Sequence, residues 1–203
     1  MPKLIIINGA SGAGKTFLLE KITNPAHSDM VAIKKYTTRS PRDDNEKIEA
    51  HDLIFSQSVD YIKSLTYKYP FKDEWYGIDE KDITNAPNKG KYPCVILRDY
   101  PTITTLRAKY DENSLAYYIQ GVYSGNDLKQ LLLKQGRSEN EADSAVARNQ
   151  ENFDQYYTHL TKDFFEDKNL FDGIIINYYN ETFIGQFNYY LKRDKKNNAK
   201  EEK

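Results

Sequence analysis

The sequence has few of the features that mark secreted, membrane-spanning or nucleic-acid-binding proteins. Its 203 residues include one cysteine, Cys94, so no disulfide can form within the chain. The apolar neighbours of Cys94 favour a buried hydrophobic role for this thiol. No uninterrupted apolar run approaches the length of a membrane-spanning helix, and the 29 basic and 30 acidic residues leave a net charge of −1. We therefore expect a cytoplasmic protein with no nucleic-acid partner and no membrane partner.

The length and composition are typical of one α/β domain. The hydrophobic fraction is 39% and the charged fraction is 29%, which is an ordinary balance for a globular chain. A chain of this length buries a sizeable core and leaves room for an inserted lobe. The 17 tyrosines are unusual in number, but they predict no chemistry by themselves.

Residues 4–16 have the sequence Leu-Ile-Ile-Ile-Asn-Gly-Ala-Ser-Gly-Ala-Gly-Lys-Thr, and the rest of the chain is organised around them. The apolar run Leu4 to Ile7 is typical of a strand buried on both faces of a parallel sheet. The Gly-x4-Gly-Lys-Thr pattern that follows predicts a phosphate-binding loop, because its glycines let successive N–H groups point into one hollow. The alternative without ligand binding is a glycine-rich turn, but the strand before the loop and the helix after it favour a phosphate-binding loop. Lys15 is expected to neutralise the β- and γ-phosphates of ATP, and Thr16 to place its hydroxyl on Mg2+. The residues expected to bind ATP here are Gly9, Ala10, Ser11, Gly12, Ala13, Gly14, Lys15 and Thr16.

A second motif, Thr37-Thr38-Arg39-Ser40-Pro41-Arg42, follows a short apolar run. Two arginines three residues apart, beside hydroxyl side chains, can bind a phosphate group through their planar forks. A solvated basic loop explains the same residues equally well on this pattern alone.

The remaining pattern predicts alternating strands and helices. Strands are expected at 30–33, 53–55, within 65–78, at 94–97, 115–119 and 172–177. Helices are expected at 14–23, 58–64, 79–84, 101–109, 124–133, 141–168 and 181–191. Asp79 and Ser124 are the expected N-caps, and Pro101 fits a first helical turn. Residues 43–51 indicate a polar turn.

The two phosphate motifs together resemble the guanylate kinase family of P-loop nucleoside monophosphate kinases. The resemblance is collinear over most of residues 3–191. The opening loop of the family, Gly-x-Ser-Gly-x-Gly-Lys-[Ser/Thr], matches Gly9 to Thr16. Its Thr-Thr-Arg-x-x-Arg segment, with a glutamate four residues later, matches Thr37 to Arg42 and Glu46.

Three further segments resemble the family more weakly. Tyr76-Gly77 is similar to a Tyr-Gly pair in the acceptor lobe of the family. Arg137 and Arg148 have the spacing of two lid arginines that contact the transferring phosphates. Residues 172–177 are similar to the final Asp-x-x-Ile-x-Asn strand, whose asparagine, Asn177 here, lies near the donor adenine.

The resemblance implies a three-layer αβα fold of the P-loop NTPase class with a mostly parallel central sheet. It also implies a single kinase domain at 1–192, followed by a charged flexible tail at 193–203. The domain would consist of a core (about 1–36, 93–133 and 149–192), a β-rich acceptor-binding lobe (about 37–84) and a helical lid (about 134–148). Such an enzyme uses ATP and Mg2+, acts on small nucleotide substrates, and is a monomer or a homodimer.

The resemblance also assigns roles to single residues. Lys15, Arg39, Arg137 and Arg148 would be catalytic, with Thr16 on the metal. Each lid arginine has the alternative of an ordinary helix-surface charge. The acceptor-binding set would be Tyr36, Thr38, Arg39, Arg42, Tyr76 and Asp99.

The departures from the family pattern cluster in the acceptor lobe. Tyr67 stands where the family has the glutamate that reads guanine, and Ile78 stands where it has Ser or Thr. Asp52 falls near the position of a phosphate-contacting tyrosine, and Leu97-Arg98-Asp99 replaces Asp-x-Asp. A carboxylate that reads a pair of guanine N–H groups contributes about 1.5–3 kcal/mol per bond, so strict selectivity for GMP is hard to support without it. Five residues either line an acceptor pocket or serve packing, namely Tyr67, Trp75, Tyr76, Ile78 and Arg98.

The preferred interpretation is phosphoryl transfer from ATP to a nucleoside monophosphate, either GMP or dGMP or another one. One alternative is a kinase of another phosphorylated acceptor, such as ribose 1,5-bisphosphate. A second is a non-catalytic guanylate kinase-like nucleotide-binding module, against which the intact loop argues. A third is a P-loop NTPase that hydrolyses nucleotide without an acceptor.

Overall fold

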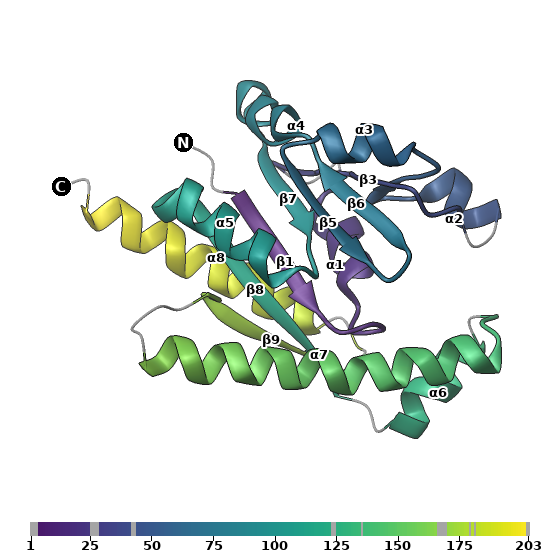
Figure 1. Cartoon of the computed structure of the whole chain (residues 1–203). Coiled ribbons are helices and arrows are strands. Elements are labelled where there is room, and N and C mark those ends of the chain that lie inside the picture. Colours follow the sequence, from purple (N-terminus) through teal and green to yellow (C-terminus); the bar gives the residue numbers. More distant parts are fainter. Residues whose placement is uncertain are drawn as a thin grey trace. The chain divides into compact units, whose positions relative to one another are not determined.

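The computed structural model describes residues 4–24, 29–41, 44–122, 125–134, 136–165, 170–178, 180 and 182–201 (Figure 1). The chain forms two compact units. The first contains Met1–Ile7 and Thr16–Ala116, and the second contains residues 8–15 and 117–203. The phosphate loop therefore belongs to the second unit, and the Thr-Thr-Arg motif belongs to the first.

Five strands form a mostly parallel central sheet. Their order is β2-β7-β1-β8-β9, and β1 and β2 each pair with β7 in parallel, as β8 does with β9. Apolar residues fill these strands, and every residue of β1 is buried, as a parallel sheet covered on both faces requires. The mostly parallel sheet with flanking helices confirms the predicted α/β class. The strands are β1 (Leu4–Gly9), β2 (Met30–Ala32), β7 (Tyr92–Ile96), β8 (Ser114–Gly121) and β9 (Gly173–Asn177).

The first unit has a second sheet of four strands. They are β3 (Lys35–Thr37), β4 (Leu53–Ile54), β5 (Tyr67–Phe71) and β6 (Glu74–Ile78), in the order β4-β3-β6-β5. Strands β5 and β6 form the predicted hairpin, with Phe71 opposite Glu74. Lys72 has a φ of 56° in the two-residue turn, a conformation that tight hairpin turns require.

The helices of the first unit are short. They are α1 (Lys15–Ile22), α2 (Asp44–Glu49), α3 (Val59–Ser64), α4 (Glu80–Asn85) and α5 (Tyr100–Tyr110), with 3₁₀ turns η1 (Pro87–Lys89) and η2 (Asp111–Asn113). Helices α3, α4 and α5 have side-chain N-caps. The Asp79 carboxylate caps α4 by accepting the N–H of Lys81 at 3.0 Å, as predicted. Pro101 lies in the first turn of α5, which is also as predicted.

The helices of the second unit are longer. They are α6 (Gly125–Lys134), α7 (Glu139–Phe165) and α8 (Thr182–Glu201). Helix α6 lies along the N-terminal part of α7 (Figure 1), and the two share a small apolar core. That core consists of Leu128, Leu132, Ala142 and Ala145. Ser138 and Glu141 form a capping box at the start of α7, with their side chains 2.8 Å apart.

Three features differ from the sequence prediction. Residues 43–51 contain helix α2 instead of a polar turn. Strand β3, in which the Thr-Thr-Arg motif begins, was not predicted. Helix α8 continues to Glu201, beyond the predicted end at 191. The predicted strand at 94–97 and the buried state of Cys94 are confirmed.

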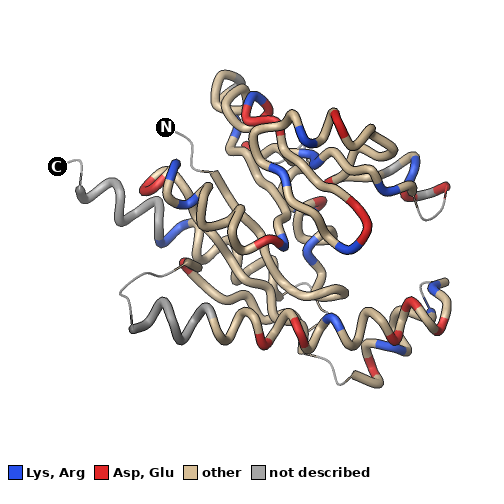
Figure 2. The backbone as a smooth tube through the Cα atoms, viewed as in Figure 1, with Lys and Arg blue, Asp and Glu red and all other residues tan. Residues whose placement is uncertain are grey.

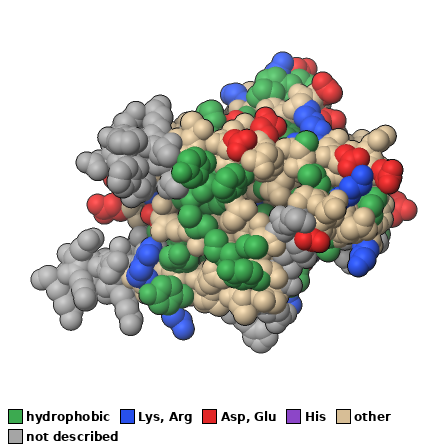
Figure 3. Space-filling model, turned by 90° about the horizontal axis from the view of Figure 1, so that it is seen from below, with side chains coloured by type: hydrophobic (Ala, Val, Ile, Leu, Met, Phe, Trp, Pro, Cys, Tyr) green, Lys and Arg blue, Asp and Glu red, His purple; other side chains and the backbone are tan. Residues whose placement is uncertain are grey.

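The surface mixes charges of both signs with scattered aromatic side chains. Basic and acidic residues are interspersed along the described chain (Figure 2), and hydrophobic side chains gather on the face in Figure 3. The exposed aromatic side chains of the second unit include Phe153, Tyr157, Tyr178 and Tyr189. Among the described residues, no helix is both long enough and apolar enough to cross a membrane.

Candidate active site

The phosphate loop lies between the end of β1 and the start of α1, and its glycines are required by the space around them. Gly9 has a φ of 144°, and a Cβ there would lie 2.5 Å from the carbonyl oxygen of Ile119. Gly14 has a φ of 92°, and a Cβ there would lie 2.5 Å from Nδ2 of Asn177. A side chain at either position would be strained and would also clash. Packing around the loop and its backbone conformation therefore both require glycine at these two positions.

Lys15 is buried against the loop that it would serve. Lys15 is 7% exposed, and its ammonium donates to the carbonyl oxygens of Gly9 at 2.7 Å and Ala10 at 2.5 Å. These bonds hold a positive charge at the hollow of the loop, and burial strengthens its attraction for an anion. The predicted contact of Lys15 with the phosphates of ATP stays a prediction.

Asn177 braces the loop from the end of β9. It is 2% exposed, and its side-chain amide donates to the carbonyl oxygen of Ala13 at 3.0 Å. The sequence predicted a contact between Asn177 and the donor adenine. That contact stays a prediction, whereas the contact with the loop is present in the structure.

Thr16 occupies the first turn of α1 and is exposed. Among the residues that the structure describes, no group of three or more His, Cys, Asp or Glu side chains could hold a metal ion. The assignment of Thr16 to Mg2+ stays a prediction; the ion commonly binds through one or two protein ligands together with substrate phosphates and water, and here it would neutralise charge on the phosphates.

The two arginines predicted to lie on a lid are found on different parts of the α6–α7 hairpin. Arg137 precedes α7, and its N–H donates to the carbonyl oxygen of Leu132 at 3.1 Å. Arg148 lies on α7 itself, and both residues are half-buried. Their contact with a transferring phosphate stays a prediction.

Arg39 of the first unit is held in one orientation. Its guanidinium donates to both carboxylate oxygens of Glu46, at 2.7 and 3.0 Å, and to the carbonyl oxygen of Ser40 at 3.0 Å. It also lies 4.9 Å from the centre of the Phe55 ring. Burial lowers the pKa of Arg39, but the hydrogen bond and charge of Glu46, with the Tyr76 hydroxyl, raise it overall. Arg39 and Tyr76, two predicted acceptor residues, are therefore neighbours.

Tyr76 belongs to one face of the four-stranded sheet, which we name the Tyr76 face. Thr37 pairs with Tyr76 across β3 and β6, and Tyr76 pairs with Tyr69 across β6 and β5. The Tyr69 and Tyr76 rings stack with their centres 5.7 Å apart. Because side chains alternate along a strand, Lys35 shares this face with Thr37.

Close packing explains why position 77, in the Tyr-Gly pair, is a glycine. A Cβ on Gly77 would lie 2.7 Å from Leu65 and 3.1 Å from Ile62. These two residues belong to the α3 region, which therefore covers the sheet face opposite to Tyr76. Only a residue without a side chain lets α3 approach β6 so closely.

Tyr36 and Thr38, two other predicted acceptor residues, form hydrogen bonds with residues other than Arg39. The Tyr36 hydroxyl lies 3.4 Å from Asp82 on the opposite sheet face. The Thr38 hydroxyl donates to Glu74 at 2.5 Å and accepts the N–H of Trp75 at 3.0 Å.

The last two predicted acceptor residues are Asp99, which the structure describes, and Arg42, which it does not. The Asp99 carboxylate caps α5 by accepting from the N–H of Thr102 at 2.8 Å and its hydroxyl at 2.6 Å. This contact is structural, and a contact with the acceptor stays a prediction. Arg42 lies outside the described residues.

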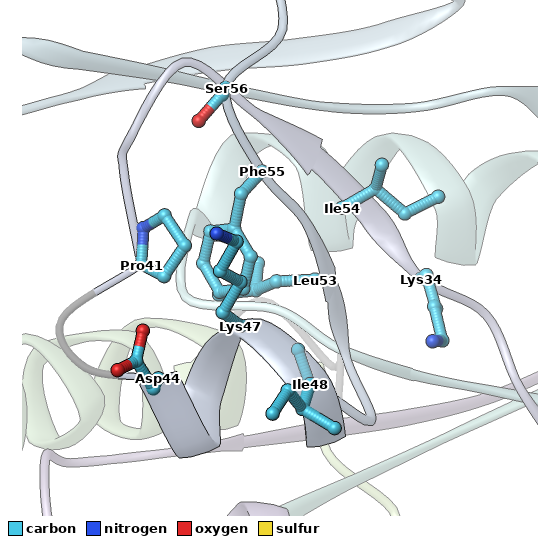
Figure 4. Close-up of a pocket in the computed structure, with 10 residues that line it drawn as sticks. Lys34, Pro41, Asp44, Lys47, Ile48, Leu53, Ile54, Phe55 and Ser56 are labelled. Carbon is cyan, nitrogen blue, oxygen red and sulfur yellow. The ribbon is translucent and has the colours of Figure 1, made fainter.

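A cavity of about 700 Å³ lies beside the Arg39–Glu46 pair. Figure 4 shows Lys47 and Asp44 approaching it from α2, with Phe55 behind them and the Ser56 hydroxyl above. Phe55 also contacts Arg39, so the cavity adjoins the candidate phosphate clamp. The sequence did not predict this hollow, because α2, which forms one wall, was not predicted. Its other lining residues are Lys34, Pro41, Ile48, Ala50, Leu53 and Ile54.

Comparison with known proteins agrees with the sequence resemblance. The chain is 31% identical over 127 residues to a guanylate kinase of Chlamydia muridarum and 27% identical over 114 residues to one of Chlamydia felis. These matches cover 59% and 54% of this chain, and 58% and 54% of the relatives. The chain thus spans little more than half the length of these curated relatives. A guanylate kinase of Porphyromonas gingivalis is 22% identical over 140 residues, 67% of this chain and 73% of the relative.

The fold agrees with the same family. The crystal structure of guanylate kinase from Anaplasma phagocytophilum superposes with a TM-score of 0.62 at 16% identity, and covers 95% of this chain and 86% of that one. The chain is guanylate kinase-like. No family model matches it. The guanylate kinase-like chain therefore resembles the family in its fold and over part of its sequence.

Proposed function

We propose that this guanylate kinase-like chain transfers a phosphoryl group from ATP to a nucleoside monophosphate, either GMP or dGMP or another one. The observation that carries the proposal is the phosphate loop, with a buried Lys15 ammonium on its own carbonyl oxygens and an amide brace from Asn177. This arrangement supports the proposal of an anion site at the loop. Arg39, oriented by Glu46 and adjoining Tyr76, supports a second phosphate site in the first unit.

The reaction needs no covalent intermediate. The bond between the γ-phosphorus and the oxygen that bridges it to the β-phosphate breaks, and ADP leaves with that electron pair. An oxygen of the acceptor phosphate forms the new bond to phosphorus. In this proposal Lys15 and the loop amides stabilise charge on the donor, Arg39 holds the acceptor phosphate, and Arg137 and Arg148 stabilise the transferring group.

The test is ADP release from ATP–Mg2+ with a panel of acceptors. The panel contains GMP, dGMP, AMP, CMP, UMP, dTMP, IMP and ribose 1,5-bisphosphate. Lys15→Ala should lower the rate by about 100-fold or more, because it removes a buried charge at the developing negative charge. Lys21→Ala, which removes an exposed lysine of the same helix, is the matched control and should keep the wild-type rate.

Each outcome has a clear meaning. Rapid turnover of one nucleoside monophosphate supports the proposal and names the acceptor. Preference for ribose 1,5-bisphosphate supports the alternative acceptor class. Wild-type turnover in Lys15→Ala, or ATP binding without transfer to any acceptor, contradicts the proposal. The second result favours a nucleotide-binding module, and rapid acceptor-independent hydrolysis favours a P-loop NTPase.

A further inference from the structure

The phosphate loop packs on three different elements of the second unit. Gly9 lies against Ile119 of β8 and Gly14 lies against Asn177 of β9, so both ends of the loop contact the central sheet. Gly12, in the middle of the loop, lies against Leu128 of α6 instead. All of these residues belong to the same unit. The middle of the loop is therefore supported by a helix that is not part of the sheet.

The contact between Gly12 and Leu128 is close. A Cβ on Gly12 would lie 2.6 Å from Cδ1 of Leu128, and because Cβ is bonded directly to Cα, the Gly12 backbone touches this side chain. Apart from the sequence neighbours of Gly12, the three described atoms nearest to such a Cβ all belong to Leu128. Gly12 has a φ of 79°, and the N–H of Ala13 donates to the Ala10 carbonyl oxygen at 3.2 Å. Leu128 therefore supports the loop at its turn.

Leu128 is also a central residue of the core between α6 and α7. It is 0% exposed, and the other buried members of this core are Leu132, Ala142 and Ala145. The two helices are packed tightly at the start of α6, where a Cβ on Gly125 would lie 3.1 Å from Val146. Close-packed interiors transmit small displacements because they contain few voids. A displacement of the α6–α7 hairpin would therefore move the support beneath Gly12.

The same hairpin carries the two arginines that are predicted to contact the transferring phosphate. The backbone N–H of Arg137 donates to the carbonyl oxygen of Leu132, which is a member of the core. Arg148 follows Ala145, another member of the core, by three residues on α7. The apolar core therefore connects the phosphate loop with the backbone that carries both arginines.

We propose that Leu128 is a positioning residue of the phosphate loop, which holds Gly12 in the conformation that binds phosphate and couples the loop to the α6–α7 hairpin. The inference rests on the proposed function for the nature of the ligand. Leu128 has no polar group, so it acts on a phosphate only through the loop. Glycine has the greatest backbone freedom of all residues. Without the leucine, Gly12 would have to be ordered when the ligand binds, which lowers affinity.

A matched pair of variants separates this role from ordinary core packing. Leu128→Ala and Leu132→Ala each truncate a leucine of the same core, at residues that are 0% and 1% exposed. The two residues are one helical turn apart on one face of α6, so both variants should lose stability by similar amounts. Only Leu128→Ala removes the atoms that contact Gly12. Leu128→Val and Leu132→Val form a milder pair, and Leu128→Met tests rescue because it keeps the apolar volume.

Hydrogen exchange of residues 9–16, measured by mass spectrometry without a ligand, reports directly on the loop. We expect faster exchange of this segment in Leu128→Ala than in the wild-type protein and in Leu132→Ala. The valine pair should show the same difference at a smaller size, so the comparison remains possible if an alanine variant does not fold. Leu128→Met should restore slow exchange.

Titration calorimetry with Mg2+–tripolyphosphate reports on binding by the loop. If the loop of Leu128→Ala adopts its binding conformation for about one-tenth of the time, the Kd rises by about 10-fold. Leu132→Ala and Leu128→Met should bind nearly as tightly as the wild-type protein. In steady-state kinetics, the KM for ATP should rise more than the KM for the acceptor, because the loop is proposed to bind the donor.

The outcomes distinguish the inference from the proposed function. Equal loop exchange in the two alanine variants, or in the valine pair if the alanine variants do not fold, overturns the inference. An equal loss of tripolyphosphate affinity in both members of the pair also overturns it, because Leu128 would then contribute to the core alone. A wild-type protein that binds no tripolyphosphate, or that transfers phosphate to no acceptor, contradicts the proposed function. Loop exchange decides the role of Leu128 in either case.

Discussion

Replacement of Asn177 by alanine tests how the phosphate loop is held. The side-chain amide of Asn177 donates to the Ala13 carbonyl oxygen at 3.0 Å, and both residues are 2% exposed. The variant leaves this carbonyl without its donor at a site that water reaches poorly. Such a loss costs about 1–3 kcal/mol. If the loop bears the whole cost, the Kd for a bound triphosphate rises by about 5- to 150-fold.

The assay separates this brace from the predicted contact with adenine. Titration calorimetry measures binding of Mg2+–ATP and of Mg2+–tripolyphosphate, which has no base or sugar. If Asn177 acts through the loop, both ligands lose affinity by a similar factor. If Asn177 acts through adenine, ATP alone loses affinity.

The control variant is Asn152→Ala. It removes a hydrogen bond of 3.3 Å between Asn152 and the Tyr118 hydroxyl, in the same unit but on α7. It should lower stability modestly and leave both affinities unchanged. Wild-type binding of tripolyphosphate by a folded Asn177→Ala protein would refute the brace.

Three further predictions concern stability. Gly77→Ala should lower the free energy of unfolding by about 1–3 kcal/mol through overpacking against α3. Gly185→Ala, at an open helical position, should raise the free energy of unfolding slightly. Urea unfolding measures both changes. Burial raises the pKa of Tyr67 to about 12, above its unfolded value of about 10, so stability should be complete below pH 10 and fall between pH 10 and 12. The difference between the urea midpoints at pH 8 and pH 11 should therefore be smaller in Tyr67→Phe than in the wild type, because other buried tyrosines still lose stability at alkaline pH, and an equal alkaline loss in that variant contradicts the assignment. Ser138→Ala should cost about 0.5–2 kcal/mol by removing the capping box with Glu141, and an unchanged thermal midpoint would show that the cap contributes nothing.

The parallel sheet was predictable because its strands are continuous apolar runs. Leu4 to Ile7 shows this most clearly, since burial on both faces leaves no polar residue to confuse the pattern. The phosphate loop was predictable for a different reason. Its residue types follow from local requirements, such as the positive φ angles and the lack of space for a side chain at Gly9 and Gly14.

Strand β3 and helix α2 were not predictable because tertiary pairing defines them. Lys35 looks like a surface residue in sequence, but Asp52 and the Ile96 carbonyl let it be buried. Helix α2 has only six residues, too few to be stable alone. The bond between Arg39 and Glu46 fastens it to the neighbouring motif.

The acceptor residues illustrate the same limit. The motif lists Tyr36, Thr38 and Arg39 in sequence, but strand alternation sends Tyr36 to the opposite face of the sheet from Tyr76. A motif gives residue types and spacing. The pairing partner of its strand decides which of those residues can act together.

The fixed orientation of Arg39 has a consequence for the thermodynamics of acceptor binding. A free arginine side chain loses up to about 1.5–2 kcal/mol of rotamer entropy when it is immobilised. Here the Glu46 carboxylate, the Ser40 carbonyl and the Phe55 ring have already ordered it in the folded chain. That entropy is lost once, during folding, and not at each binding event. The heat of acceptor binding should therefore be offset by less entropy in the wild-type protein than in a variant whose Arg39 has been released from Glu46.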